Sequence, residues 1–313
     1  MRVLVSGHRG FIGYHLCNRL LECGHEVVGV DEMNSYYDIK FKERRTINSD
    51  NFCEHICSIE ELDKDFFERY KFDAVVNLAG QAGVRYSIEN PMEYVRCNLL
   101  GFCNLLDLSR RYGVDHFLYA SSSSVYGDIK TMPFREEYEI NSLKSFYATT
   151  KYCNELIARN YSSVYGIRTS GMRFFTVYGE EGRPDMMYYK MAEAMRTDEP
   201  ITIHTGELYR DFTYIRDIVE GIMCLLCSDD EGAEIYNIGC GETVSLCDFI
   251  RMFEEIWGKE LKKEYISPTR VDVSATFADI SKMKNKVGWM PKVSIKEGLE
   301  NFIKWYKECY NVK

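Results

Sequence analysis

Tyr147 and Lys151 are the pair in this sequence best suited to acid–base chemistry, because they stand four residues apart in a helical pattern. Side chains at this spacing share one face of a helix. A free phenol has a pKa of about 10, and a nearby ammonium group or other cation lowers it by favouring the phenolate. Tyr147 is therefore predicted to act as a base near neutral pH. The same spacing is common on ordinary helix surfaces, so other residues must support the prediction.

A run of four serines supplies a partner for this pair. It occupies residues 121–124 and follows an apolar stretch, residues 116–120, that predicts a strand. A hydroxyl at the end of that strand can share the proton that Tyr147 would take from a substrate. A polar loop is the ordinary alternative for such a run.

The first thirty residues have the pattern of a unit that binds a dinucleotide. Residues 2–6 predict a buried strand, a turn with three glycines follows, and residues 26–31 predict a second strand after a helix. In such a unit Gly7 allows the tight turn, Gly10 lets the backbone approach a pyrophosphate, and Gly13 lets the helix pack closely on the strand. The spacing is one residue longer at the front than the usual fingerprint, so the strand–helix–strand context carries the prediction.

NAD is the dinucleotide that these residues favour. The N-terminus of the helix, at Phe11 and Ile12, offers N–H donors and a partial positive charge to phosphates. Asp31 ends the second strand and can accept hydrogen bonds from the ribose hydroxyls. It would repel a 2′-phosphate, which argues against NADP. Leu78 and Ala79, at the end of the strand expected over residues 73–79, are predicted to line the same site.

The wider pattern predicts an α/β fold with a doubly wound, Rossmann-type parallel sheet. Strands alternate with helices, which are expected over residues 11–24, 60–70, 93–112 and 147–165. In such a sheet the ligand lies beyond the C-terminal ends of the strands, which is where the glycines, Asp31, Ala79 and the serines fall. After about residue 170 the pattern is less regular. We expect residues 1–172 to bind NAD and residues 173–313 to form mainly a smaller α/β substrate lobe, with some interleaving.

Composition excludes several classes of protein. The net charge of −9 argues against nucleic acid as a partner, and no apolar run reaches the length of a membrane span. The first predicted strand begins at residue 2, so no leader is expected. The twelve cysteines are scattered. Cys224 and Cys227 stand at metal-ligand spacing in an apolar helical stretch, but no second such pair accompanies them, so we expect no metal site and a reducing, cytoplasmic location.

Five stretches carry a resemblance to a known family; they are residues 77–87, 121–127, 173–179, 182–186 and 209–215. Through them the sequence resembles the extended short-chain dehydrogenase/reductase family, and within it the nucleotide-sugar 4-epimerases, above all those acting on UDP-glucuronate. The resemblance implies a catalytic triad of Ser122, Tyr147 and Lys151 with NAD. It also implies that Arg210 and Arg270 hold the diphosphate of a UDP-sugar, and that helices 93–112 and 147–165 pair in a homodimer. One departure is His55, which stands where an aspartate usually meets the adenine.

The residues after Ser122 bear on the reaction. The related dehydratases have an Asp-Glu pair there and the related decarboxylases a glutamate, whereas this chain has Ser123 and Ser124, which cannot serve as carboxyl acids. Interconversion of UDP-glucuronate and UDP-galacturonate is therefore expected. The alternatives are 4-epimerisation of a neutral UDP-sugar such as UDP-glucose, a decarboxylase or dehydratase, and a non-catalytic NAD-binding protein.

A sugar carboxylate at C6 would need fixed donors. Oxidation at C4 makes it a β-keto acid, which loses CO₂ readily when its carboxylate is desolvated. Arg183 offers a charged planar fork that matches a carboxylate, and Thr176 offers a hydroxyl where the related neutral-sugar epimerases tend to have asparagine. Ser123 and Ser124 are expected nearby. Arg85 is a second candidate, with a surface salt bridge as its alternative.

Overall fold

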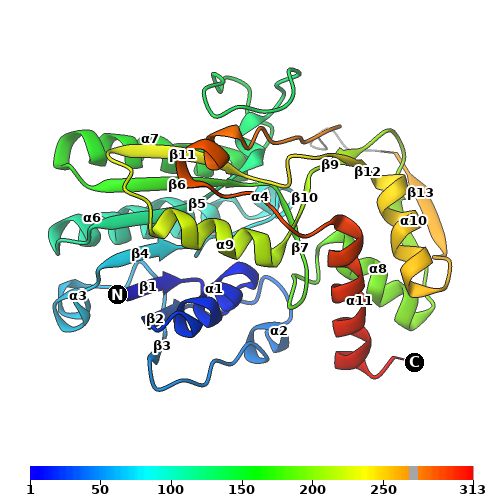
Figure 1. Cartoon of the computed structure of the whole chain (residues 1–313), viewed down its shortest axis with the longest axis horizontal. Coiled ribbons are helices and arrows are strands. Elements are labelled where there is room, and N and C mark those ends of the chain that lie inside the picture. The colour runs from blue at the N-terminus through cyan, green and yellow to red at the C-terminus, as the bar shows by residue number, and fades with distance from the viewer. Residues whose placement is uncertain (268–273, 313) are drawn as a thin grey trace.

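A seven-stranded parallel sheet forms the centre of the protein, as a computed structural model that describes residues 1–267 and 274–312 shows (Figure 1). Its order is β11-β6-β5-β4-β1-β2-β3. The bounds are β1 (Arg2–Ser6), β2 (Glu26–Asp31), β3 (Phe52–Ile56), β4 (Ala74–Asn77), β5 (His116–Ser122), β6 (Arg168–Phe174) and β11 (Ala233–Ile238). The doubly wound order, with β1 between β2 and β4, confirms the predicted Rossmann-type fold.

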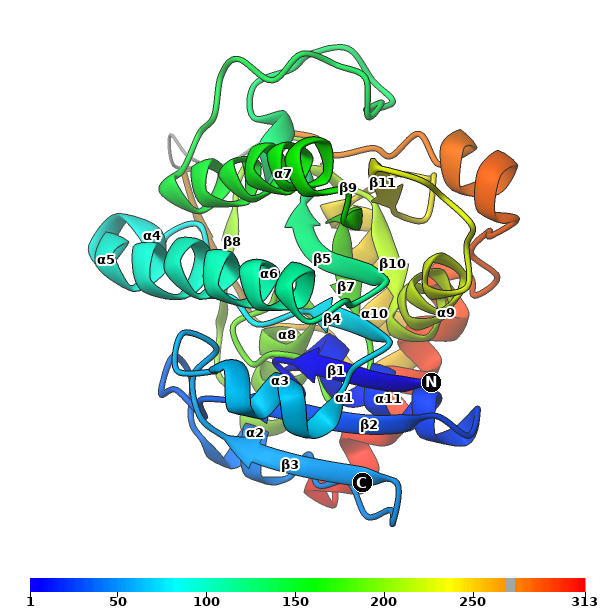
Figure 2. The same ribbon diagram turned by 90° about the vertical axis from the view of Figure 1, so that its left-hand side faces the viewer.

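Helices cover both faces of the sheet (Figure 2). One face carries α1 (Phe11–Glu22) and α9 (Ile215–Leu226); the other carries α3 (Lys64–Tyr70), α6 (Phe102–Arg111) and α7 (Phe146–Tyr165). Successive side chains of β1 therefore enter different cores, with Val3 and Val5 in the core that contains α9 and Leu4 in the core that contains α6. Burial on both faces explains why the strands are continuous apolar runs.

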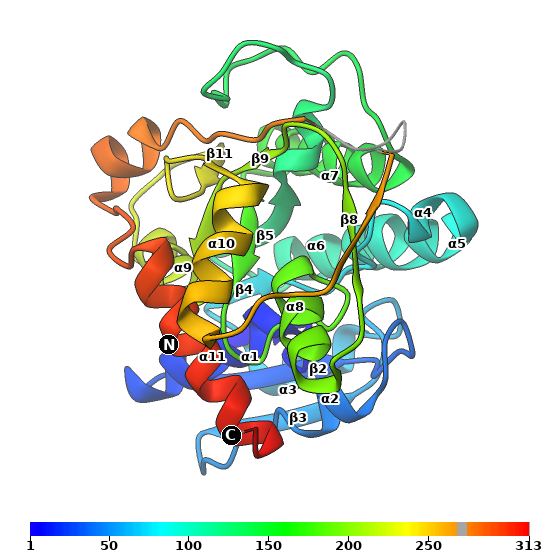
Figure 3. The same cartoon turned by 90° about the vertical axis from the view of Figure 1, so that its right-hand side faces the viewer.

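A smaller lobe stands at the C-terminal ends of the strands (Figure 3). Its elements are α8 (Met187–Thr197), β8 (Ile201–His204), α10 (Leu246–Trp257), β13 (Lys263–Ile266) and α11 (Ile295–Tyr310). Two short strand pairs join it to the sheet: β7 (Thr176–Tyr178) with β10 (Phe212–Tyr214), and β9 (Tyr209–Arg210) with β12 (Val244–Ser245). Across residues 1–267 and 274–312, no helix is both long and apolar enough to cross a membrane.

The helix expected over residues 93–112 is broken into parts. The chain forms α4 (Tyr86–Glu89), α5 (Pro91–Tyr94) and a π-helix (Val95–Gly101) before α6 begins. The π-helix carries Asn98, whose side-chain amide makes two hydrogen bonds. Its Oδ1 accepts from the Gln81 N–H at 2.7 Å, and its Nδ2 donates to the Thr150 hydroxyl at 3.0 Å. This widened turn thus ties the loop after β4 to α7, and π-turns are common beside functional sites.

One further boundary differs from expectation. The helix expected from residue 60 begins at Lys64, because Asp63 caps it by accepting a hydrogen bond from the Phe66 N–H at 3.1 Å. A short helix, α2 (Lys40–Glu43), lies in the charged segment between β2 and β3.

Candidate functional site

A cavity of about 1320 Å³ lies between the sheet and the smaller lobe. Drug-sized ligands fill roughly 300–1,000 Å³, so this cavity has room for more than one nucleotide. Its walls come from the C-terminal ends of β1, β2, β4 and β5 and, on the opposite side, from α8 and β8. Most of the predicted site residues line it, as described below.

The glycine turn after β1 has the close packing that a dinucleotide cradle needs. Gly7 adopts φ +77°, and its N–H donates to the carbonyl of Val30 at 2.7 Å. A Cβ on Gly13 would lie 2.1 Å from the carbonyl oxygen of Gly7, so only glycine lets α1 start this close to β1. Gly7, Gly10, Phe11, Ile12 and Gly13 all line the cavity, and the residues present therefore fit a pyrophosphate at the helix N-terminus.

Asp31 lies at the cavity wall as predicted, but its carboxylate already has partners. It accepts from the backbone N–H groups of Arg9 at 3.1 Å and Met33 at 2.8 Å, and pairs with Lys42 at 3.1 Å. Lys42 was not among the predicted site residues; it lies on α2, between β2 and β3. Glu32 also lines the cavity beside Asp31, so this end keeps an acidic character.

His55, the departure noted in the sequence, is not among the residues that the structure describes as lining the cavity. The His55 ring bonds to the hydroxyl of Tyr70 at 2.7 Å. Cys57, Ile59 and Glu60 form the wall there instead. Leu78 and Ala79, the other predicted cofactor contacts, do line the cavity.

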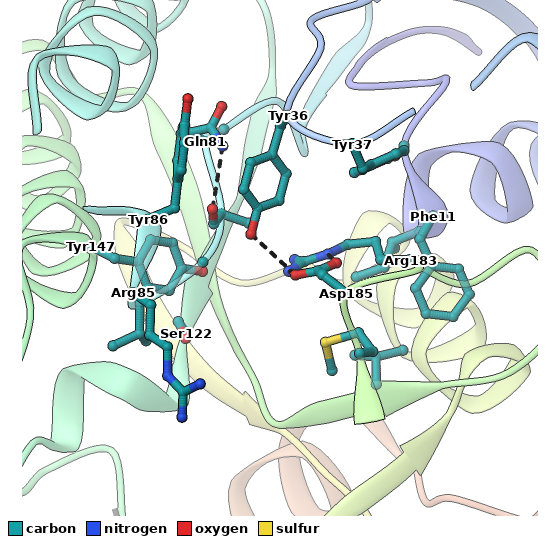
Figure 4. Close-up of a pocket in the computed structure, with 18 of the residues that line it drawn as sticks. Phe11, Tyr36, Tyr37, Gln81, Arg85, Tyr86, Ser122, Tyr147, Arg183 and Asp185 are labelled. Carbon is teal, nitrogen blue, oxygen red and sulfur yellow. Dashed lines mark hydrogen bonds and ion pairs between the residues drawn. The ribbon is translucent and has the colours of Figure 1, made fainter. Parts of the chain in front are cut away.

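Tyr147, Lys151 and Ser122 all line the cavity, and Figure 4 shows Tyr147 and Ser122 at its wall. Tyr147 lies in the first turn of α7, where Ser145 caps the helix by accepting from the Ala148 N–H at 3.1 Å. The Lys151 amine donates to the carbonyl of Ala120 at 2.9 Å, which fixes it beside the end of β5. Three side chains from two neighbouring elements thus share one wall.

Burial sets the protonation of these groups. It lowers the pKa of Lys151 to about 8. It raises the pKa of Tyr147, and the groups that offset this rise are Ser122, through a hydrogen bond, and Arg183, through its charge. From the sequence, Lys151 was expected to favour the Tyr147 phenolate. In the structure the charge of Arg183, which was not predicted for this role, favours it.

A buried ion pair that the sequence analysis missed supports this wall. Arg173 on β6 donates to Glu155 on α7 through Nε at 2.9 Å and Nη2 at 2.7 Å, and Ser121 donates to the same carboxylate at 2.5 Å. Glu155 stands four residues after Lys151, so its helical spacing was the available signal. The pair ties α7 to β6, and the Ser121 hydrogen bond ties α7 to β5, the strand that ends in Ser122.

Arg183 lies in the cavity, but its guanidinium already holds a carboxylate. It donates to Asp185 through Nε at 2.9 Å and Nη2 at 2.5 Å, and the Tyr36 hydroxyl donates to the same carboxylate at 3.1 Å (Figure 4). Neither Asp185 nor Tyr36 was predicted. The Arg183 charge holds the pKa of Asp185 below its usual range, so Asp185 is ionised at neutral pH.

Four of the remaining predicted substrate residues line the cavity, and the two arginines expected at the diphosphate do not appear among its described lining residues. Ser123, Ser124, Thr176 and Arg85 line the cavity, and Arg85 is exposed, with its Nη2 atom 2.7 Å from Nε2 of His204.

The two arginines expected to bind the diphosphate are not among the cavity-lining residues that the structure describes. Arg210 lies on β9 and donates to the carbonyls of Tyr209 at 2.8 Å and Ser274 at 3.2 Å, and the described lining residues do not include it. Arg270 lies outside the described residues.

Comparisons with known proteins agree with this geometry. Residues 3–239 match the pattern of the NAD dependent epimerase/dehydratase family. A UDP-glucuronate 4-epimerase of Thermodesulfobacterium geofontis is 40% identical, over 97% of this chain and 96% of that protein.

Two solved structures cover nearly the whole chain. The UDP-glucuronic acid 4-epimerase of Bacillus cereus, in complex with UDP-glucuronic acid and NAD, superimposes with a TM-score of 0.93 at 33% identity, over 99% of this chain and 100% of that one. The UDP-glucose 4-epimerase of Thermotoga maritima, with UDP-glucose, gives a TM-score of 0.92 at 29% identity, with the same coverage.

Proposed function

This chain belongs to the NAD-dependent epimerase/dehydratase family, and we propose that it interconverts UDP-glucuronate and UDP-galacturonate by epimerisation at C4 with NAD. One observation carries the proposal: Ser122, Tyr147 and Lys151 share a wall with three uncharged hydroxyl side chains, Ser123, Ser124 and Thr176, and no carboxylate takes the positions after Ser122. This set can move a proton at a sugar hydroxyl. It lacks the extra acid that dehydration or assisted decarboxylation needs.

NAD fits the cradle formed by the glycine turn. When bound, NAD would supply an acceptor for the C4 hydride of the sugar and, once reduced, a donor for its return to the opposite face, so that it would be regenerated in each cycle. Phe11 and Ile12 would give N–H groups to its pyrophosphate, and Asp31 would accept from a ribose hydroxyl. Leu78 and Ala79 would line its path across the ends of the strands.

The chain's own groups handle the proton. Tyr147 would take the proton of the C4 hydroxyl, and Ser122 would share it through the hydrogen bond that offsets part of the burial-induced rise in the pKa of Tyr147. The Lys151 ammonium and the Arg183 guanidinium favour the phenolate. After the keto sugar turns in the pocket, the same phenol returns the proton.

The acid sugar is favoured over a neutral one for a chemical reason. A 4-keto glucuronate is a β-keto acid, and fixed donors must keep its carboxylate charged and solvated. We propose Thr176, Ser123, Ser124 and Arg183 as these donors, with Arg85 as a further candidate from the exposed rim. The neutral alternative is a UDP-glucose 4-epimerase, which the similarity to the Thermotoga maritima enzyme keeps open.

We also propose which part of the chain binds each ligand, and that the protein forms a homodimer. Residues 1–172 would hold NAD, while residues 173–313 would mainly hold the nucleotide sugar, although from this second part α9 packs on the sheet and β11 is one of its strands. Arg210 and Arg270 are proposed to hold the diphosphate. A homodimer through the helices over residues 86–111 and α7 is proposed, in a reducing cytoplasm that suits twelve free cysteines.

The test is incubation of the purified protein with UDP-glucuronate, with and without added NAD⁺. UDP-galacturonate should accumulate to an equilibrium mixture, and Tyr147→Phe should lose most of the turnover while still binding both ligands. A panel with UDP-glucose, read by product stereochemistry, separates the neutral alternative. Absence of UDP-galacturonate in every arm contradicts the proposal.

A further inference from the structure

Asp185 stands where a ligand carboxylate would otherwise meet Arg183. It lies between β7 and α8, and both of its oxygens face Arg183 (Figure 4). The Tyr36 hydroxyl holds it from the other side at 3.1 Å, and the Tyr36 ring packs on Tyr86 with ring centroids 4.9 Å apart. The position of Asp185 is thus set by contacts from both halves of the chain.

The geometry of the guanidinium leaves room for a second carboxylate. A guanidinium presents five N–H donors in a plane, and Asp185 uses those on the Nε side, through Nε and Nη2. No hydrogen bond within the described part of the chain uses Nη1. Arg183 can therefore bridge two carboxylates, Asp185 on one edge and a ligand on the other.

We propose that Asp185 is a positioning residue that shares Arg183 with the sugar carboxylate and so weakens the binding of that carboxylate to Arg183. The inference rests on the proposed function and deepens it. Asp185 would orient the Nη1–Nη2 edge of Arg183 into the cavity, while its negative charge would offset part of the attraction. A 4-keto acid sugar must turn over between the two hydride steps, and a carboxylate held by an unshared guanidinium would resist that turn.

The experiment measures affinity and turnover separately. The Kd values of UDP-glucuronate and UDP-glucose are measured by calorimetry on the NAD-loaded protein in a Tyr147→Phe background, where no product forms. Asp185→Asn removes one charge beside Arg183, so UDP-glucuronate should bind roughly five- to tenfold tighter, with little change for UDP-glucose. With Tyr147 restored, Asp185→Asn should lower both kcat and KM for UDP-glucuronate.

Two variants keep the result interpretable. Glu199→Gln removes a negative charge from the exposed rim of the same cavity, beyond the far end of α8, and should leave the ratio of the two Kd values unchanged. Asp185→Glu retains the charge and should return the ratio toward the wild-type value. If Asp185→Asn shifts both sugars equally, shifts neither, or weakens UDP-glucuronate, the inference is wrong. Failure of the wild-type protein to epimerise UDP-glucuronate would instead contradict the proposed function.

Discussion

Arg183 shows at the scale of single residues why a side chain's role depends on its neighbours. As a lone residue in the sequence it offers a fork for a carboxylate. In the fold its charge also offsets part of the rise in the pKa of Tyr147, and its guanidinium is itself held by Asp185. Its removal should therefore affect the substrate, the base and an internal carboxylate together.

Arg183→Ala is expected to discriminate between acid and neutral sugars. Loss of a charge-assisted hydrogen bond costs on the order of 1.5–3 kcal/mol, or about ten- to a hundredfold in kcat/KM for UDP-glucuronate. Asp185 would then keep the Tyr36 hydroxyl but lose its cationic partner, and would repel the sugar carboxylate. Any turnover of UDP-glucose should fall much less, and decarboxylated pentose product should increase. Equal losses on both sugars, with no pentose by mass spectrometry, would mean that Arg183 is structural.

Glu54 gives a pH-dependent contribution to stability. Hydrogen bonds from Arg9, at 2.5 and 2.8 Å, are the main reason why the pKa of Glu54 falls to about 2, and they hold the glycine turn against β3. Because the folded-state value is below the unfolded one, this stabilisation is complete above pH about 4.5 and disappears as pH falls through about 2.

Glu54→Gln tests this contribution. At pH 7 it should lower the free energy of unfolding by about 2 kcal/mol, and the difference from the wild type should narrow as the pH approaches 2. Urea denaturation at several pH values measures it, with Glu68→Gln, an exposed acid on α3, as the control. A difference that does not depend on pH would contradict the assignment.

Elements with a regular period could be predicted from the sequence, whereas those defined by distant partners could not. The apolar runs of β1, β2 and β5 and the helical spacing of α1 and α7 are local signals, and the structure has each of them within one or two residues. In contrast, β9 and β10 have only two and three residues and exist because they pair with β12 and β7.

The same distinction applies to the site. Residues in contiguous motifs, such as the glycine turn and the serine run, could be predicted and do line one cavity. Lys42, Glu155 and Asp185 gain their roles from partners far along the chain, or from a loop whose conformation has no periodic signal. Sequence spacing alone does not reveal such contacts.

The N-cap of α7 links an element's stability to the site, because Tyr147 lies in the turn that Ser145 caps. Ser145→Ala should cost about 1 kcal/mol of stability. It should also lower kcat several-fold, because fraying of this turn displaces the phenol. Ser294→Ala removes the matching cap of α11 and should cost similar stability without the loss of kcat. Unchanged kcat in Ser145→Ala, despite the stability loss in thermal unfolding, would contradict the link.

At the scale of the whole molecule, two neighbouring helical segments carry several exposed apolar side chains. The helices over residues 86–111 and α7 lie side by side on the face of the sheet opposite α1 (Figure 2). Their outer sides expose Met92 at 71%, Ile88 at 60%, Leu100 at 58% and Leu156 at 45%. Apolar side chains gathered on neighbouring helices are typical of an interface. A second copy of the chain is the partner we propose, as a symmetric contact would bury both copies of this surface at once.

The dimer predicts a definite mass. Light scattering on the wild-type protein at micromolar concentration should give about 73 kDa, twice the 36.6 kDa of one chain. The double substitution Leu100→Glu and Leu156→Glu would force two charges into the contact on each copy. Burial of an unpaired charge costs more than burial of a leucine contributes, about 1.5–3 kcal/mol, so this variant should be monomeric. Tyr265→Glu, at a comparably exposed residue on β13, should leave the dimer intact. A wild-type species of 36.6 kDa would show that these helices are only the outer layer of a monomer.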